Sequence, residues 1–280
     1  MKVAVIGSGT MGCGIAQVFI ENEFEVILKD IDDECLKRGK QIIEKNLDKK
    51  IRKGKMTYED KNKVMNNLTL TKDLQDLKNV DLVIEAVSEN MDIKKEIFRQ
   101  LDNIVNDKAI FATNTSTLSI TEMAFETTRP DRFIGMHFFN PAQVMKLVEV
   151  ISTVSTSNEI EDKILKLCRD IQKTPVKVNE SPGFIVNRLL IPMINEAIGV
   201  LSDNVATKEE IDTAMKLGAA HPMGPLELSD LIGNDVVLNI MEILYKEFGD
   251  DKYRPHPLLR KMVRANQLGR KTKKGFYEYE

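Results

Sequence analysis

The chain has 280 residues and a mass of 31.8 kDa, which predicts one large domain accompanied by a smaller one. Hydrophobic residues make up 42% of it and charged residues 30%, as in globular proteins with a substantial core. The net charge is −3 and no basic segment is flanked by aromatic residues, which argues against a nucleic-acid-binding protein. No apolar run approaches the ~20 residues of a membrane-spanning helix.

The first residues and the cysteines indicate the cellular compartment and whether a structural metal site is expected. The first residues, MKVAVIGSG, begin a strand pattern at once, so we expect no targeting peptide and a cytoplasmic protein. Cys13, Cys35 and Cys168 are isolated from one another. Such cysteines suit a reducing compartment and argue against a disulfide framework or a structural zinc site.

The first 180 residues alternate short β-branched runs with longer amphipathic runs. Strands are predicted at 2–7, 25–30, 68–71, 80–87, 109–114, 133–139, 145–152 and 174–180. Helices are predicted at 11–22, 33–53, 91–105 and 158–173. This alternation predicts a largely parallel sheet with helices on both faces.

The pattern changes after Ser181-Pro182-Gly183. Helical apolar spacing dominates 184–203, 208–219, 225–248 and 257–267, and Thr207 with Glu210 forms a capping box before the second of these. Only the terminal GFYEYE resembles a strand. We therefore predict a nucleotide-binding domain over residues 1–182 and a smaller all-helical domain over 183–280.

A glycine-rich loop follows the first strand and opens the first helix. Gly7, Gly9 and Gly12 have the G-x-G-x-x-G spacing, which permits a tight turn, a close approach of backbone to a pyrophosphate, and close helix–strand packing. The helix N-terminus would face the phosphates. We include the intervening Ser8, Thr10 and Met11 in the predicted cofactor contact, although Met11 is also suited to packing.

Asp30 ends the next strand, eighteen residues after Gly12. A carboxylate at this position would bind a ribose 2′-hydroxyl and repel a 2′-phosphate, so NAD is favoured over NADP. Lys29 beside it weakens the preference. A glycine turn without any dinucleotide would not require strand, loop, helix and acid in this order.

Polar residues follow two further strands. Glu89 comes after the strand at 80–87, and Asn114, Thr115, Ser116 and Thr117 come after the strand at 109–114. Ligands of open parallel sheets bind outside the carboxyl ends of the strands, so these side chains are candidates for the site.

One of the three histidines, His137, lies in an apolar run, and so does Glu149. The loop between their strands is too short for a crossover helix, so the strands should pair antiparallel. With the turn centred on Gln143, residues 137 and 149 lie six positions from it on either side and face each other. Opposed Cβ atoms lie roughly 4.5–5.5 Å apart, within reach of a carboxylate–imidazole hydrogen bond. The fold class is therefore α/β: a Rossmann-type, mostly parallel sheet with an antiparallel edge, followed by the helical domain.

A paired glutamate would fix the histidine tautomer, leave the other ring nitrogen to exchange a proton, and stabilise the imidazolium. Beside a nicotinamide this arrangement suits alcohol oxidation, in which the base takes the hydroxyl proton as hydride leaves carbon. The alternative is a core histidine paired with glutamate for structural reasons alone.

Several segments resemble one enzyme family. They are GSGTMGCGIAQ, IEAVSENMDIKKEIF, ATNTSTLSIT, GMHFFNPAQVMKLVEV, SPGFIVNRLLIPMINEA, DTAMKLGAAHPMGPLEL and KKGFYEY. Together they resemble the 3-hydroxyacyl-CoA dehydrogenase family, in particular the short bacterial members that act on 3-hydroxybutyryl-CoA in butyrate-forming metabolism. The resemblance extends from the first strand to the last residues.

The resemblance implies residue roles. His137 matches the catalytic histidine, Glu149 the glutamate that orients it, Ser116 a serine bonded to the 3-oxygen of the substrate, and Asn187 an active-site asparagine of the helical domain. The residues matched to the nicotinamide and its ribose are Glu89, Lys94 and Asn140; with Asn114 and Ser116 they complete the predicted cofactor contacts.

Lys53 in the basic stretch 45–55 matches a lysine that contacts coenzyme A, and Asn46 occupies a position where the family has serine. Each residue has a simpler alternative. Ser116 could cap a helix that starts near Leu118, Asn187 could be a solvated helical residue, and Lys94 could be a surface lysine. A lysine-rich helix is usually a solvated face.

The predicted function is therefore NAD-dependent interconversion of an (S)-3-hydroxyacyl-CoA and its 3-ketoacyl-CoA, with His137 as acid and base. A dehydrogenase of free hydroxy acids is an alternative, but such enzymes use a lysine where this chain has Asn187. A catalytically idle dinucleotide-binding protein is a third possibility, and an intact histidine–glutamate pair argues against it. The helical domain has more apolar periodic positions than its own core requires, which predicts a homodimer through that domain.

Overall fold

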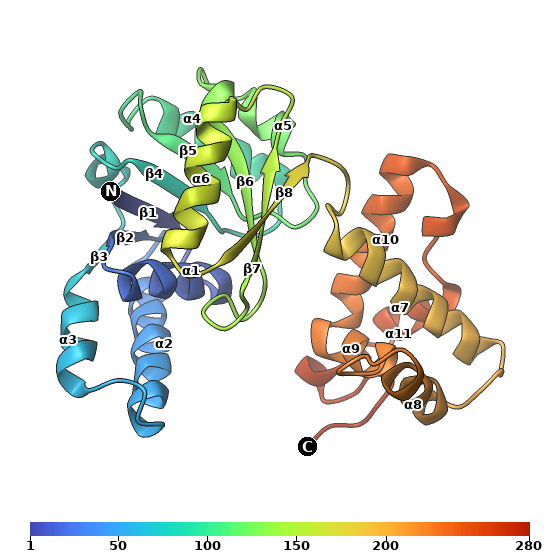
Figure 1. The fold of residues 1–280 in the computed structure, drawn as a ribbon. Coiled ribbons are helices and arrows are strands. Elements are labelled where there is room, and N and C mark those ends of the chain that lie inside the picture. The colour runs from blue at the N-terminus through green and yellow to red at the C-terminus, as the bar shows by residue number, and fades with distance from the viewer. The chain divides into compact units, whose positions relative to one another are not determined.

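A computed structural model describes residues 1–280 and contains two compact units, Met1–Glu180 and Ser181–Glu280 (Figure 1). The division follows Glu180, whereas the sequence prediction placed it after residue 182. The first unit is an α/β domain and the second is helical.

A single eight-stranded sheet forms the centre of the first unit. Its strands are β1 (Lys2–Ile6), β2 (Glu25–Lys29), β3 (Leu68–Thr71), β4 (Leu82–Glu85), β5 (Ile110–Thr113), β6 (Phe133–Phe138), β7 (Leu147–Ser152) and β8 (Thr174–Asn179). They follow the order β3-β2-β1-β4-β5-β6-β7-β8, and β6–β7 is the one antiparallel pair. The order of the first six strands is that of dinucleotide-binding sheets. The predicted fold class, a Rossmann-type sheet with an antiparallel edge followed by helices, is confirmed.

Helices cover both faces of this sheet. They are α1 (Thr10–Glu21), α2 (Asp33–Arg52), α3 (Tyr58–Asn66), α4 (Met91–Asp102), α5 (Ile120–Ala124) and α6 (Asn158–Asp170). Buried residues of α1, α2 and α6 join one hydrophobic cluster with Val5, Ile84 and Met136 of the strands. On the opposite face, Phe98 of α4 packs against Phe133 of β6, with ring centroids 4.6 Å apart. Figure 1 shows α6 running across the sheet near β7 and β8.

Two helices of the first unit were not among the predicted helices, although a helix starting near Leu118 was considered as an alternative explanation of Ser116. Helix α3 is capped by a reciprocal pair, in which the Thr57 side chain bonds the Asp60 backbone and the Asp60 side chain bonds the Thr57 backbone. The T-x-x-D spacing was the signal that could have located it. Helix α5 has only five residues, too few for a periodic pattern to be recognised.

The alternation of side chains along β6 determines which face carries His137. Phe133 contacts α4, and a Cβ on Gly135 would lie 2.4 Å from Ile120 Cδ1 of α5. Residues 133, 135 and 137 share one face because side chains alternate along a strand. His137 therefore lies on the α4–α5 face, in the last residues of β6.

The second unit consists of helices α7 (Val186–Ser202), α8 (Lys208–Gly218), α9 (Pro225–Ile232), α10 (Asn234–Phe248) and α11 (Pro257–Arg264). Its core contains Ile194, Ile198, Leu226, Met241 and Leu259, all at 0% exposure. The capping box of Thr207 and Glu210 is confirmed. The segment predicted as one helix at 225–248 is broken at Gly233, whose φ of 106° favours glycine. None of the helices in either unit is long and apolar enough to cross a membrane.

The sequence suggested a strand for the terminal GFYEYE, and this prediction is wrong: the segment makes a single isolated bridge, between Glu278 and Lys274. Asp230, at 1% exposure, accepts hydrogen bonds from the backbone N–H groups of Phe276 and Tyr277, at 3.0 and 2.9 Å, and from the Tyr279 hydroxyl. These partners are more than forty positions away in sequence, so no local pattern could reveal them. Burial, and then Asp230, raise the pKa of Tyr279 to about 12.

Candidate active site

The glycine loop connects β1 to α1 in the conformation that its spacing predicts. Gly7 has φ +100°, and a Cβ there would lie 2.7 Å from the Ala86 carbonyl oxygen. A Cβ on Gly12 would lie only 1.8 Å from the Gly7 carbonyl oxygen. Both positions therefore require glycine for reasons internal to the protein.

Gly9 differs, because a Cβ there would have no atom within 4 Å. It is the N-cap of α1, and no side chain caps this helix end. Backbone amides that face open space at a helix N-terminus form an anion-binding surface. The open space at Gly9 and the uncapped helix end therefore suit the pyrophosphate of a dinucleotide.

Asp30 follows β2 and is bound to the same loop. Its Oδ2 accepts hydrogen bonds from Ser8 N and Ser8 Oγ, both at 2.6 Å, and its Oδ1 accepts one from Ile31 N. The carboxylate therefore lies beside the glycine loop, where a ribose hydroxyl would meet it. Thr10 is exposed and Met11 partly buried; Met11 packs against the hydrophobic cluster.

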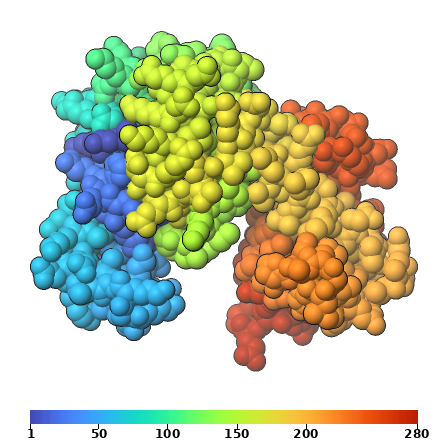
Figure 2. All heavy atoms as spheres, viewed as in Figure 1, coloured from blue at the N-terminus to red at the C-terminus, as the bar shows by residue number.

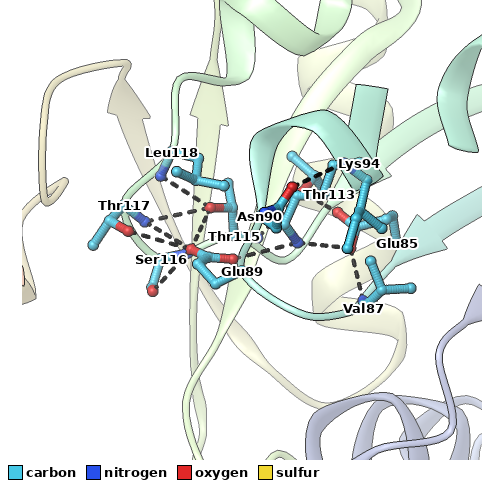
Figure 3. A network of polar contacts seen from close by, with 11 residues as sticks. Glu85, Val87, Glu89, Asn90, Lys94, Thr113, Thr115, Ser116, Thr117 and Leu118 are labelled. Atoms are coloured by element: carbon cyan, nitrogen blue, oxygen red, sulfur yellow. Dashed lines mark hydrogen bonds and ion pairs between the residues drawn. The ribbon is translucent and has the colours of Figure 1, made fainter. Parts of the chain in front are cut away.

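Glu89 follows β4 and accepts hydrogen bonds from residues of the loop after β5 (Figure 3). Its Oε1 accepts hydrogen bonds from Thr115 Oγ1 at 2.6 Å, Ser116 N at 2.9 Å and Ser116 Oγ at 3.2 Å. Thr117 adds two longer bonds, from its N and its Oγ1, each 3.3 Å. One carboxylate oxygen thus holds the loop that carries Ser116.

The ionisation of Glu89 follows from opposing effects. Burial acts to raise its pKa, but the positive charge of Lys94 and the hydrogen bonds from Thr115 and Ser116 outweigh it. The pKa of Glu89 is therefore lower than usual, and the side chain is a carboxylate at neutral pH.

Lys94 is not a surface lysine, since its exposure is 1%. Its Nζ lies 2.6 Å from Glu85 Oε1 and 3.3 Å from Glu89 Oε2. Glu85 in turn accepts from Val87 N and Thr113 Oγ1, each at 2.7 Å. Figure 3 shows Lys94 between the two carboxylates.

Three further predicted site residues lie at the same edge of the sheet. Ser116 does not cap a helix, because α5 begins at Ile120 and Ser119 is its N-cap. The Asn114 side chain accepts from Phe138 N at 2.8 Å and so connects the ends of β5 and β6. Asn140 is exposed two residues after β6.

His137 and Glu149 are directly opposed in the β6–β7 ladder, in the register that a turn centred on Gln143 predicts. His137 Nδ1 lies 2.7 Å from Glu149 Oε2, and the side chains are 7% and 1% exposed. The Phe139 ring lies 4.5 Å from the imidazole, centroid to centroid. The contact of the two side chains is thus present, at the carboxyl end of β6, beside the loop of Asn114 and Ser116.

Three predicted residues lie elsewhere. Asn187 is in the first turn of α7, in the second unit, and is partly buried. Asn46 of α2 donates through Nδ2 to Gln17 Oε1 of α1 at 3.0 Å. Lys53 is the exposed C-cap of α2. In the space-filling view, α2 and α3 form the blue lobe at the lower left (Figure 2).

Comparison with known proteins identifies the family. Residues 2–181 match the model of the NAD-binding domain of 3-hydroxyacyl-CoA dehydrogenase, and residues 183–279 match that of its C-terminal domain. The chain belongs to the 3-hydroxyacyl-CoA dehydrogenase family. The resemblance stated from sequence motifs is confirmed, and NAD is the cofactor of the first unit.

Individual relatives are similar over nine-tenths or more of their lengths. A 3-hydroxybutyryl-CoA dehydrogenase of Clostridioides difficile is 58% identical over 279 residues, which are 100% of this chain and 99% of that protein. The human mitochondrial hydroxyacyl-coenzyme A dehydrogenase is 43% identical over 286 residues, covering 99% and 91%. The crystal structure of (S)-3-hydroxybutyryl-CoA dehydrogenase from Ralstonia eutropha is 48% identical with a TM-score of 0.97, covering 100% and 99%.

Sequence reasoning missed two buried charges of this family member. Glu85 is 0% exposed in β4, and Lys173 donates through Nζ to the carbonyls of Ala142 and Met145, at 2.7 and 2.8 Å. Burial lowers the pKa of Lys173. An acid inside the apolar run VDLVIEAV was the same signal that singled out Glu149, and it could have located Glu85.

The glycine loop yields a paired prediction. Gly9→Ala should leave the melting temperature unchanged, because the new methyl group meets no protein atom, but it should weaken NADH binding about tenfold or more by occupying the pyrophosphate approach. Gly12→Ala should instead cost about 1–3 kcal/mol of folding free energy or more, because its methyl group overlaps the Gly7 carbonyl. NADH fluorescence titration and thermal unfolding measure the two effects. Unchanged NADH affinity in Gly9→Ala would contradict the assignment of the glycine loop to the pyrophosphate.

Glu89 yields a prediction about pH. Its folded-state pKa lies below the usual 4.5, so its stabilising effect is complete above the unfolded pKa and is lost as pH falls from there through the folded pKa. The difference in unfolding free energy between the wild type and Glu89→Gln should therefore be constant from neutral pH down to about pH 5 and shrink only below that. Urea unfolding at a series of pH values measures it. A difference that grows as pH falls from 7 to 5 would mean that burial, not Lys94, dominates, because a carboxyl with a raised folded-state pKa stabilises the fold as it takes up its proton.

Proposed function

We propose that this chain is an NAD-dependent dehydrogenase that interconverts (S)-3-hydroxybutyryl-CoA and acetoacetyl-CoA, within butyrate or fatty-acid metabolism in the cytoplasm. The observation that carries the proposal is the buried contact of 2.7 Å between His137 and Glu149 at the carboxyl end of a dinucleotide-binding sheet. The similar proteins named as 3-hydroxybutyryl-CoA dehydrogenases support the substrate. The three isolated cysteines, unpaired by any disulfide, are compatible with a reducing compartment.

His137 would act as the base in oxidation and the acid in reduction. Since Glu149 contacts Nδ1, the proton of the substrate hydroxyl would be exchanged at Nε2. The carboxylate keeps the ring in one orientation and stabilises the imidazolium formed when the proton arrives. Bound NAD would accept the hydride from C3 in one direction and return it in the other.

Ser116 and Asn187 would hold the substrate. Ser116 lies on a loop fixed by Glu89, so its hydroxyl is kept near the end of β5 as a partner for the 3-oxygen. Asn187 comes from the second unit and would contribute an amide to the thioester region.

Coenzyme A carries phosphates, and an exposed cation is the chemical group that they require. Lys53 is such a cation, at the end of α2 and within the basic stretch 45–55. Asn46 already donates to Gln17, so its remaining hydrogen-bonding capacity would serve the substrate. We therefore assign the phosphate contact chiefly to Lys53.

The acid–base assignment predicts a large loss of turnover. His137→Gln and Glu149→Gln should each lower kcat for acetoacetyl-CoA reduction by NADH by ~10²–10⁴-fold, the usual contribution of a positioned acid–base group. NADH affinity should change little, because neither side chain is assigned to the cofactor. His221→Gln, in the second unit and outside the proposed chemistry, is the matched control and should retain the wild-type rate. Near-wild-type turnover of both variants would mean that His137 and Glu149 form a purely structural pair.

Two other functions remain to be separated by the same assay. A dehydrogenase of free hydroxy acids would reduce the free 3-keto acid at least as well as its CoA ester, and an idle protein would bind NADH without turnover. A similar solved structure, 30% identical with a TM-score of 0.87, is a diketoreductase that acts on dicarbonyl compounds. Assays with C4 to C10 acyl-CoA esters, the free acids and a diketone, each with NADH and NADPH, separate these functions.

We also propose a homodimer through the second unit. Large apolar side chains of its helices are exposed: Leu189 by 70%, Leu217 by 83%, Leu231 by 48% and Val236 by 40%. Apolar surface of this kind marks association sites when it is contiguous. Sedimentation equilibrium should give a mass near twice 31.8 kDa, and a mass of 31.8 kDa at micromolar concentration would contradict the dimer.

A further inference from the structure

We infer that Glu85 is a positioning residue that acts through Lys94 and Glu89 on the loop carrying Ser116. The inference rests on the proposed function for the role of Ser116, but the contacts themselves do not. Glu85 would touch neither substrate nor cofactor, because its side chain is 0% exposed in the sheet. Its effect would pass through two further side chains.

The first step is the pairing of Glu85 with Lys94. Glu85 accepts three hydrogen bonds: from Lys94 Nζ at 2.6 Å, Val87 N at 2.7 Å and Thr113 Oγ1 at 2.7 Å. Thr113 is also the registered partner of Glu85 across β4 and β5. The carboxylate is therefore fixed by the sheet on one side and by the start of the β4–α4 loop on the other.

The second step is the position of Lys94. Its ammonium group is buried at 1% exposure and lies between two carboxylates, closer to Glu85 than to Glu89. A buried ammonium requires compensating charge and hydrogen bonds to remain protonated. Removing the charge of Glu85 leaves it with Glu89 alone, at 3.3 Å. The ammonium group would then shift toward Glu89, and the Glu89 carboxylate would be displaced.

The third step is the dependence of the loop on Glu89. All of the bonds from Thr115, Ser116 and Thr117 to this side chain converge on a single oxygen, Oε1 (Figure 3). The same carboxylate presents its other oxygen, Oε2, to Lys94. A rotation that optimises the contact with Lys94 therefore moves the acceptor of the whole loop. The position of Ser116 consequently depends on a charge in the last residue of β4.

Amide hydrogen exchange of the protein without cofactor tests this directly. In Glu85→Gln the amides of residues 113–119 should exchange roughly tenfold faster or more, equivalent to about 1.4 kcal/mol, because Ser116 N and Thr117 N lose a fixed acceptor. Glutamine can still accept from Val87 N through its one oxygen and can donate through its amide nitrogen to Thr113 Oγ1, so the substitution chiefly removes charge. Unchanged exchange of this segment in a folded Glu85→Gln protein would overturn the inference.

The matched control is Asp102→Asn. Asp102 also forms a buried ion pair, with Arg129 at 2.7 Å and side-chain exposures of 6% and 8%, and it lies at the other end of α4. It should lower thermal stability without changing exchange at 113–119. If both variants accelerate exchange there equally, Glu85 has only a general stabilising role and the inference fails.

A double-mutant cycle tests the route through Lys94. Glu85→Gln and Lys94→Met should each weaken NADH binding about tenfold, and the double variant should be no weaker than Lys94→Met alone. Additive losses would exclude transmission through Lys94. The double variant removes Glu85 and Lys94 together, so neither of these two charges is left buried without the other. Should Glu85→Gln fail to fold, Thr113→Val removes one donor to Glu85 and should show the same changes at smaller size; an unchanged segment there would equally contradict the inference.

The same set separates this inference from the proposed function. A wild-type protein that binds NADH but does not reduce acetoacetyl-CoA would refute the function, while faster exchange in Glu85→Gln would still support the positioning role. Normal turnover in the wild type together with wild-type exchange, NADH affinity and turnover in Glu85→Gln would refute the positioning role alone.

Discussion

The continuation of backbone hydrogen bonding beyond the strand ends is the constraint on which the proposed site depends. Gly7 N donates to Lys29 O, Ala86 N to Ile6 O and Asn114 N to Glu85 O, each at 2.8 Å. These bonds extend the parallel ladder by one residue into the loops after β1, β4 and β5. The loops that carry the glycine motif, Glu89 and Ser116 therefore start from fixed positions at one edge of the sheet. Side chains from distant parts of the sequence converge there because the backbone leaves them little freedom.

The buried ionisable side chains of the site lie on one face of the sheet, the face that α4 and α5 cover. Glu85 and Thr113 are registered partners, and His137 and Glu149 are registered partners two strands further along. The helices on this face otherwise pack aromatic rings, such as Phe98 against Phe133. Ionisable groups in such surroundings destabilise the fold unless they are paired, and removing one partner is more damaging than removing both. Here each carboxylate is paired, which is how the fold tolerates them in positions where apolar residues would pack well.

Much of this arrangement could be predicted from the sequence, for reasons that differ from residue to residue. The register of His137 with Glu149 followed from the centre of a short turn, because the position of the turn fixes which residues of an antiparallel pair face each other. The glycine loop followed from spacing, because its requirements are steric and local. The burial of Lys94 could not be predicted in this way, since the exposure of a helical residue depends on which strand the helix covers.

Long-range partners explain the other differences. The terminal residues look like a strand, but Asp230 accepts their backbone N–H groups and prevents them from pairing as one. Asn46 was matched to a family position that contacts the substrate, but its amide donates to Gln17 of the packed helix α1. In each case the deciding partner is a polar group that is buried at a distant position, and the hydrophobic pattern of a single chain does not report such groups.

Helix α1 connects the two parts of the site that the sequence treated separately. It begins at the glycine loop, and at Gly14 it meets the turn between β6 and β7, where a Cβ would lie 2.9 Å from Gln143 Oε1 and 3.0 Å from Ala142 Cβ. Lys173 holds the same turn from another side through two backbone carbonyls. The turn sets the register that opposes His137 to Glu149. The dinucleotide loop and the His137–Glu149 pair are therefore fixed relative to each other through the first turns of α1.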